Sequence, residues 1–267
     1  MKRAFAAWMW SLGVLARSCW TFLALAVLIA LWAVGAYEWL GLPESSGLLL
    51  ILALIWAIVQ LLVAVAIVAG SASGAAEVAA ADGRKLPLRS LWVKNRKSLL
   101  STLIVCLVSF VLVLFLGGVF NWINNHSLEV ASFLTFRSQK PVSHVLIEKI
   151  YWVIEMLLWV VLSGFLLSFL TTLVGGGWAE AWKQKGKLLA GCLFRTPFLT
   201  SFLSVAVFGG LAYGLSKWHP VVSPGFRDYA QVIARFSLVS ILLAAGWSSW
   251  LLSLARLCLP KQDSPQP

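Results

Sequence analysis

Charged residues are scarce in this chain. Only 12% of its 267 residues are Asp, Glu, Lys or Arg, about half the share found in soluble domains. A water-soluble fold of this length needs more polar surface than that to cover its core. The scarcity therefore excludes a soluble enzyme, and the apolar remainder of the chain excludes a disordered protein.

Cysteine and histidine are also few, with four and three residues. The cysteines lie in or beside apolar runs, and no two have a CxxC spacing, which argues against a disulfide framework or a thiolate metal site. No HExxH motif occurs, and no apolar run contains a histidine. We therefore expect no metal, no cofactor and no catalytic residue.

Long apolar runs dominate what is present. Hydrophobic residues make up 60% of the chain, and the mean hydropathy is +0.89. A bilayer core requires about 20 apolar residues per helix, and the runs lack the alternating polarity of barrel strands. The sequence predicts an all-α bundle of six transmembrane helices, as one domain over residues 1–260 with a short disordered tail at 261–267. The six runs are Cys19–Leu40, Gly47–Gly70, Leu99–Phe120, Ile150–Val174, Phe198–Leu215 and Phe236–Leu259.

The N-terminus resembles a signal peptide, but Arg17 interrupts the pattern and the apolar stretch after it has full span length. We expect an uncleaved first span. Large apolar residues before it recur at helical spacing, which predicts a helix lying in the membrane interface. These residues are Phe5, Trp8, Met9, Leu12 and Leu15.

Basic residues are distributed asymmetrically over the loops. Fifteen of the 21 basic and four of the ten acidic residues fall on the side of the two termini, which leaves the opposite side neutral. By the positive-inside rule, both termini are cytoplasmic. We expect a multi-pass protein of a bacterial inner (plasma) membrane. Its net charge of +11 then indicates contact with anionic lipid headgroups rather than with nucleic acid.

The two predicted cytoplasmic loops resemble each other. Each has glycine, then glutamate three residues later, then a second glycine six residues after the glutamate, and an arginine before the next span. This pattern predicts a parallel internal repeat, with its symmetry axis along the membrane normal. The matched residues are Gly74, Glu77, Gly83 and Arg96 in the first copy and Gly177, Glu180, Gly186 and Arg195 in the second.

These loops also resemble a known family. A helix end rich in Gly and Ala, an acidic residue, Gly-Arg-Lys, Leu-Pro-Leu, Leu-Trp and a basic group precede the next span. The pattern is similar to uncharacterised bacterial six-helix inner-membrane proteins, which are related to the membrane domain attached to some glycerophosphodiester phosphodiesterases. The resemblance covers residues 70–103 and 175–203 and implies the six-helix architecture. The metal site of the phosphodiesterase domain has no counterpart in this sequence.

Polar residues within spans are the candidate functional site, because they are costly in lipid. Glu155 lies about one and a half turns into the fourth run, and Arg235 lies at a compatible depth at the outer end of the sixth. Gln60 lies near the middle of the second run. Glu155 is either a proton or cation site of a transporter or half of a structural ion pair, and Gln60 is either interhelical glue or a substrate contact.

Small residues recur at every fourth position in two runs, at Gly70 and Gly74 and at Ala206, Gly210 and Gly214. This spacing is typical of close helix packing. The leading hypothesis is a non-enzymatic scaffold or accessory subunit that contacts lipids and a partner membrane protein or further copies of itself. The alternative is a small transporter or channel. A transporter requires a polar cavity at mid-depth, whereas an accessory subunit requires an apolar, glycine-rich helix face.

Overall fold

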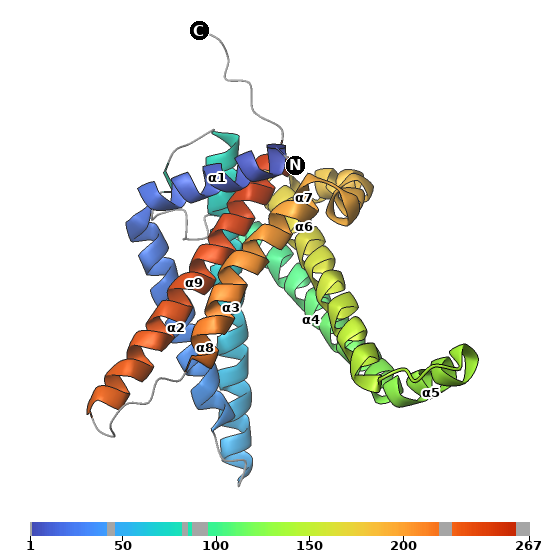
Figure 1. Cartoon of the computed structure of the whole chain (residues 1–267). Helices are drawn as coiled ribbons and strands as arrows, with labels where there is room; N and C mark the ends of the chain where they lie inside the picture. The colour runs from blue at the N-terminus through green and yellow to red at the C-terminus, as the bar shows by residue number, and fades with distance from the viewer. Residues whose placement is uncertain (1, 42–45, 82–84, 87–95, 219–225, 260–267) are drawn as a thin grey trace.

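The computed structural model describes residues 2–41, 46–81, 85–86, 96–218 and 226–259, and all elements within these ranges are helical (Figure 1). The predicted tail at 261–267 lies outside the described residues, as does Gly83. In chain order the elements are α1 (Lys2–Arg17), α2 (Cys19–Leu40), α3 (Gly47–Ala80), α4 (Arg96–Asn125), α5 (Ser127–Ser138), α6 (His144–Phe194), α7 (Thr196–Ser204), the π-helical segment η2 (Val205–Gly209), α8 (Gly210–Lys217) and α9 (Phe226–Cys258).

Six helical stretches are long and apolar enough to cross a membrane, as the sequence predicts. They are Cys19–Trp39, Gly47–Ala80, Leu99–Asn125, His144–Leu193, Thr196–Lys217 and Tyr229–Cys258. Each corresponds to one of the predicted runs. The chain is thus an all-α protein with six candidate membrane spans.

Two spans depart from a regular α-helix. The fifth consists of α7, η2 and α8, because the hydrogen-bonding pattern widens to π-type between Val205 and Gly209. The fourth continues past the predicted end at Val174, and its direction changes at Gly177, whose φ of 82° lies in the left-handed region that favours glycine. The rest of α6, residues 178–194, leaves the axis of the long helix (Figure 1).

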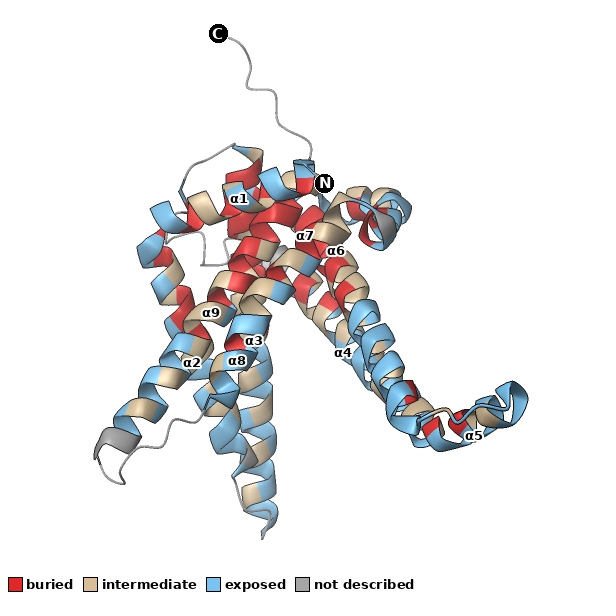
Figure 2. Cartoon of the chain, viewed as in Figure 1, coloured by how far each residue is buried: buried red, intermediate tan, exposed pale blue. Residues whose placement is uncertain are grey.

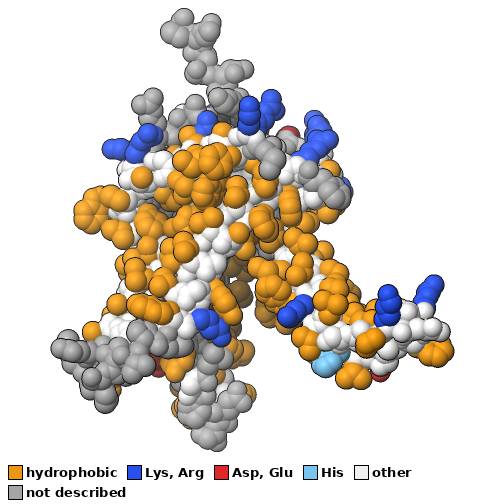
Figure 3. All heavy atoms as spheres, in the orientation of Figure 1, with side chains coloured by type: hydrophobic (Ala, Val, Ile, Leu, Met, Phe, Trp, Pro, Cys, Tyr) orange, Lys and Arg blue, Asp and Glu red, His pale blue; other side chains and the backbone are white. Residues whose placement is uncertain are grey.

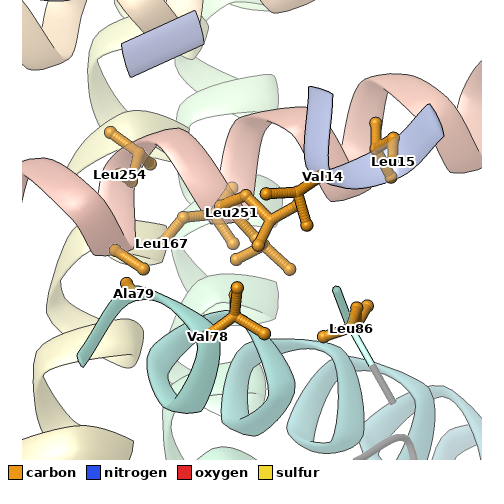
Figure 4. Packing of buried hydrophobic residues seen from close by; sticks show 11 residues of the cluster. Val14, Leu15, Val78, Ala79, Leu86, Leu167, Leu251 and Leu254 are labelled. Atoms are coloured by element: carbon orange, nitrogen blue, oxygen red, sulfur yellow. The ribbon is translucent and has the colours of Figure 1, made fainter. Parts of the chain in front are cut away.

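Buried residues concentrate at one end of the molecule, where α1 crosses the other helices (Figure 2). We call this the basic end, because α1, residues 178–194 of α6 and the last turn of α9 carry Lys and Arg there (Figure 3). Its main core joins α1, α3, α6 and α9 through side chains such as Val14, Val78, Leu167 and Leu251 (Figure 4).

Away from the basic end, the helices diverge into two limbs (Figure 1). The first limb contains α2, α3, α8 and the first half of α9, and the second contains α4, α5 and the first part of α6. Helix α9 contacts α1, α2, α3, α6, α7 and α8. Helix α3 also contacts α4 and α6, so α9 and α3 both join the limbs at the basic end.

Helix α1 forms as predicted, but its packed face coincides only in part with the large apolar residues that the sequence singles out. The buried positions include Ala4, Ala7 and Ser11, whereas Phe5 and Met9 are about half exposed. Small residues allow α1 to lie close against α9, while Leu15 is buried in the main core and Phe5 and Met9 face outward.

Candidate functional site

A cleft opens between the two limbs just below the basic end, and Figure 3 shows open space between the limbs beyond it. Its volume is about 560 Å³, within the range of pockets that hold small ligands. The lining residues come from four candidate spans. They include Leu61 and Val68 of α3, Val105 and Phe110 of α4, Leu166 and Leu170 of α6, and Trp247 and Trp250 of α9.

The cleft wall is apolar because its polar groups bond elsewhere within the protein. The indole N–H of Trp247 donates to Ser71 Oγ at 3.0 Å, and that of Trp250 donates to Ser201 Oγ at 2.8 Å. The hydroxyl of Ser109, which also lines the cleft, donates to the carbonyl of Val105 at 2.6 Å. What these residues present to the cleft is therefore mainly hydrocarbon surface.

The structure does not bring Glu155 and Arg235 together. Glu155 lies on the second limb and accepts a hydrogen bond from Trp159 Nε1 at 3.4 Å. Arg235 lies on the first limb, where its Nη2 donates to the carbonyl of Ser216 at 2.7 Å. That carbonyl is in the last turn of α8, where backbone acceptors lack helical partners and the helix dipole favours a cation. The predicted pairing fails because α6 and α9 diverge toward the ends that carry these residues (Figure 1).

Gln60 belongs to the contact between α2 and α3. Its amide lies against Gly35, where the lack of a side chain leaves room for it. Three indole N–H groups cross the same contact and donate to backbone carbonyls of the opposite helix: Trp32 to Gln60 at 3.0 Å, Trp56 to Gly35 at 2.9 Å and Trp39 to Ala53 at 2.9 Å. The Trp32 bond goes to the backbone carbonyl of Gln60, and the side-chain Oε1 of Gln60 is buried without a hydrogen-bond partner. Both interpretations of Gln60 therefore stay predictions.

Sequence reasoning missed two further glycines that permit close helix crossings. A Cβ at Gly164 of α6 would lie 2.8 Å from Ser201 Oγ of α7, and one at Gly246 of α9 would lie 2.8 Å from Cβ of Phe208 in η2. For Gly246, the serine-rich sequence around Trp247 and Trp250 could have indicated the crossing, because small polar residues let transmembrane helices approach and form hydrogen bonds.

The predicted repeat motifs occupy different conformations. Gly74 is buried inside α3, six residues before that helix ends, whereas Gly177 is the point where α6 turns. Gly186 lies within the helical segment that follows, and Glu77 and Glu180 are both helical. Arg96 begins α4, and Arg195 separates α6 from α7. Both loops thus lead into an arginine at the next helix, and the repeat stays a prediction from the sequence.

The two small-residue stripes also differ. Gly70 and Gly74 are buried in α3. Gly210 and Gly214 of α8 are exposed, and nothing lies within 4 Å of where their Cβ atoms would be. The first stripe packs within the chain, whereas the second faces outward.

The described cysteine and histidine side chains do not form a metal site. Within the described residues, no three His, Cys, Asp or Glu side chains come together as a metal site would require. His126 contacts the carbonyl of Trp122 through Nδ1 at 2.8 Å, and Cys192 lies 3.8 Å from the hydroxyl of Ser168.

Comparison of the chain with protein-family models, with curated proteins and with solved structures finds no match.

Proposed function

We propose that this chain is a membrane protein without catalytic activity that acts as a scaffold or accessory subunit through protein and lipid contacts. The observation that carries the proposal is the apolar cleft between α3, α4, α6 and α9. A cavity lined by leucine, valine and tryptophan offers little stabilisation to an ion or a polar solute. It suits hydrocarbon chains or an apolar helix.

The positions of the candidate polar residues also support this proposal over a transporter. Transport sites in membranes use ionisable groups that face a shared hydrated pathway. Glu155, Arg235 and Gln60 lie apart, and none of them is among the described residues that line the cleft. Glu155 and Arg235 each have a local hydrogen-bond partner on their own limb.

The proposal includes a location and an orientation. We place the protein in a bacterial inner membrane with both termini cytoplasmic, so that the basic end faces the cytoplasm and α1 lies in the interface. Phe5 and Met9, exposed on α1 beside Lys2 and Arg3, suit that position. The parallel repeat and the kinship with the uncharacterised six-helix family belong to the same proposal.

A flux measurement separates the two functions. We expect liposomes that contain the full chain to dissipate an imposed pH gradient no faster than protein-free liposomes, with no change for Glu155→Gln. A photo-crosslinker at Leu162 in the cleft should give an adduct of defined mass, while one at the exposed Leu54 of α3 should not. A proton flux that Glu155→Gln abolishes would contradict the proposal.

A further inference from the structure

Residues 178–194 of α6 form a helix with three distinct sides. The kink at Gly177 turns this segment away from the span, and Figure 1 shows it in gold beside the label of α7. Ala181, Leu188 and Cys192 are buried and recur at i, i+7 and i+11, which places them on one face. That face attaches the segment to the protein.

A second side carries large apolar residues that the protein leaves uncovered. Trp178, Trp182, Leu189 and Leu193 recur at i, i+4, i+11 and i+15, and they are 43%, 60%, 44% and 40% exposed. Their spacing aligns them in one stripe next to the buried face. Trp178 is also fixed in place, because its Nε1 donates to Ser101 Oγ of α4 at 2.9 Å and its ring meets Phe169 edge-on.

The remaining side is basic. Lys183 and Lys187 are exposed and lie across the helix from the apolar stripe, and no described acidic side chain forms an ion pair with them. Lys185 Nζ lies 3.9 Å from the centre of the Trp182 ring. The only acidic residue of the segment, Glu180, accepts a hydrogen bond from Gln184. The segment therefore has an apolar stripe on one side and a net positive charge, with Lys185 at the edge of the stripe and Lys183 and Lys187 across the helix from it.

We propose that residues 178–194 are a binding site for anionic phospholipid. In this arrangement Trp178, Trp182, Leu189 and Leu193 enter the boundary of the acyl region, and Lys183, Lys185 and Lys187 bind the phosphate headgroups. The inference rests on the proposed membrane location, and it adds a lipid class and the residues that select it. A nucleic acid or an acidic soluble protein would satisfy the lysines but would leave the four apolar side chains in water, so a lipid surface fits better.

The test uses the full chain in mixed micelles that contain phosphatidylglycerol or phosphatidylcholine, with bound lipid counted by native mass spectrometry. Each lysine near an anionic surface contributes about 5-fold in affinity. We therefore expect the triple variant Lys183→Gln, Lys185→Gln, Lys187→Gln to lose roughly 100-fold in its preference for phosphatidylglycerol. Its phosphatidylcholine binding should stay the same.

Two matched variants define the outcome. The charge-preserving triple Lys183→Arg, Lys185→Arg, Lys187→Arg should keep the wild-type preference. The same number of charges removed at the opposite end, by Arg137→Gln, Lys140→Gln and Lys149→Gln, should leave it within about 3-fold, below one lysine's contribution. An unchanged preference in the segment variant, or an equal loss in the opposite-end variant, would overturn the proposal. Neither result would bear on the flux measurement that tests the scaffold function.

Discussion

The basic end and the two limbs are built on different principles. At the basic end, α9 is buried among the other helices, and its last turns carry serine and leucine residues such as Ser249, Leu251 and Ser253 that have almost no exposure. In the limbs, the outer half of α3 exposes long apolar side chains such as Leu48, Leu54 and Ile55. The first region resembles a folded core, whereas the limbs contain pairs of helices, α2 with α3 and α4 with α6, that expose much of their apolar surface.

This difference follows from the physics of helix association in a membrane. Apolar side chains gain little by leaving lipid, so helices associate where small residues allow close contact or where hydrogen bonds form. Gly164 and Gly246 provide such contacts at the basic end, as do the bonds from Trp247 and Trp250. Within the first limb, Gly35 and the indole N–H groups of Trp32, Trp39 and Trp56 still join α2 to α3. The two limbs diverge from each other beyond the basic end, and the cleft lies where they part.

The largest loss of stability should come from filling a helix crossing at the basic end. We expect Gly246→Val to destabilise the fold by about 3 kcal/mol, because its Cβ would overlap Cβ of Phe208, an atom that cannot move without its backbone. Unfolding by denaturing detergent, followed by circular dichroism, measures this. The control Gly117→Val, at a position with nothing within 4 Å, should cost less than about 0.5 kcal/mol. Equal losses of stability for Gly246→Val and Gly117→Val would contradict the claim that the basic end is packed more tightly than the limbs.

A smaller loss is expected in the first limb. Gly35→Ala should cost about 1–2 kcal/mol, because the new methyl group displaces the amide of Gln60. Adding Gln60→Ala should recover most of that loss, since the shortened side chain vacates the site. A double-mutant cycle by the same unfolding assay gives the coupling. Additive losses would show that Gly35 and Gln60 do not meet.

The hydrogen bond between Trp247 and Ser71 should contribute less than either crossing. Ser71→Ala removes the acceptor of the Trp247 N–H, and such interhelical bonds contribute ~0.6 kcal/mol on average. We expect the melting temperature in detergent to fall by a few degrees at most. Ser132→Ala, at an exposed serine of α5 that bonds only to its own helix, is the control and should have no measurable effect.

The smallest expected effect is the coupling between Glu155 and Arg235. Because the two residues lie on different limbs with separate partners, the losses for Glu155→Ala and Arg235→Ala should add within about 0.5 kcal/mol. A double variant that loses much less stability than the sum of the two single losses would show that Glu155 and Arg235 form the ion pair that their depth suggests.

Much of the fold follows from the sequence, because run length and composition suffice to locate helices in lipid. Six helices long and apolar enough to cross a membrane, and the helical state of α1, are confirmed. The kink at Gly177 and the π segment at Val205–Gly209 could not be located, since each depends on how the helix packs against its neighbours. Helix α5 is too short and polar for a span criterion to detect.

The candidate site was harder to predict than the fold. Depth along the sequence places Glu155 and Arg235 at the same level, but it contains no information on the angle between α6 and α9. That angle decides whether two residues meet. The contact of Gln60 with Gly35 could have been predicted from the sequence, because a glycine within a span often allows a neighbouring helix to approach closely. The apolar cleft arises from four helices at once and had no local signature.

The divergence of the limbs from a common basic end is the central claim, and paired cysteines test it most directly. In a chain without its native cysteines, Ser71→Cys with Trp247→Cys joins two positions whose side chains are in contact at the basic end. Glu155→Cys with Arg235→Cys joins the two limbs. Treatment of membranes with a short bifunctional maleimide should cross-link the first pair and leave the second unlinked. Efficient cross-linking of the second pair would show that the limbs close, and it would contradict the account.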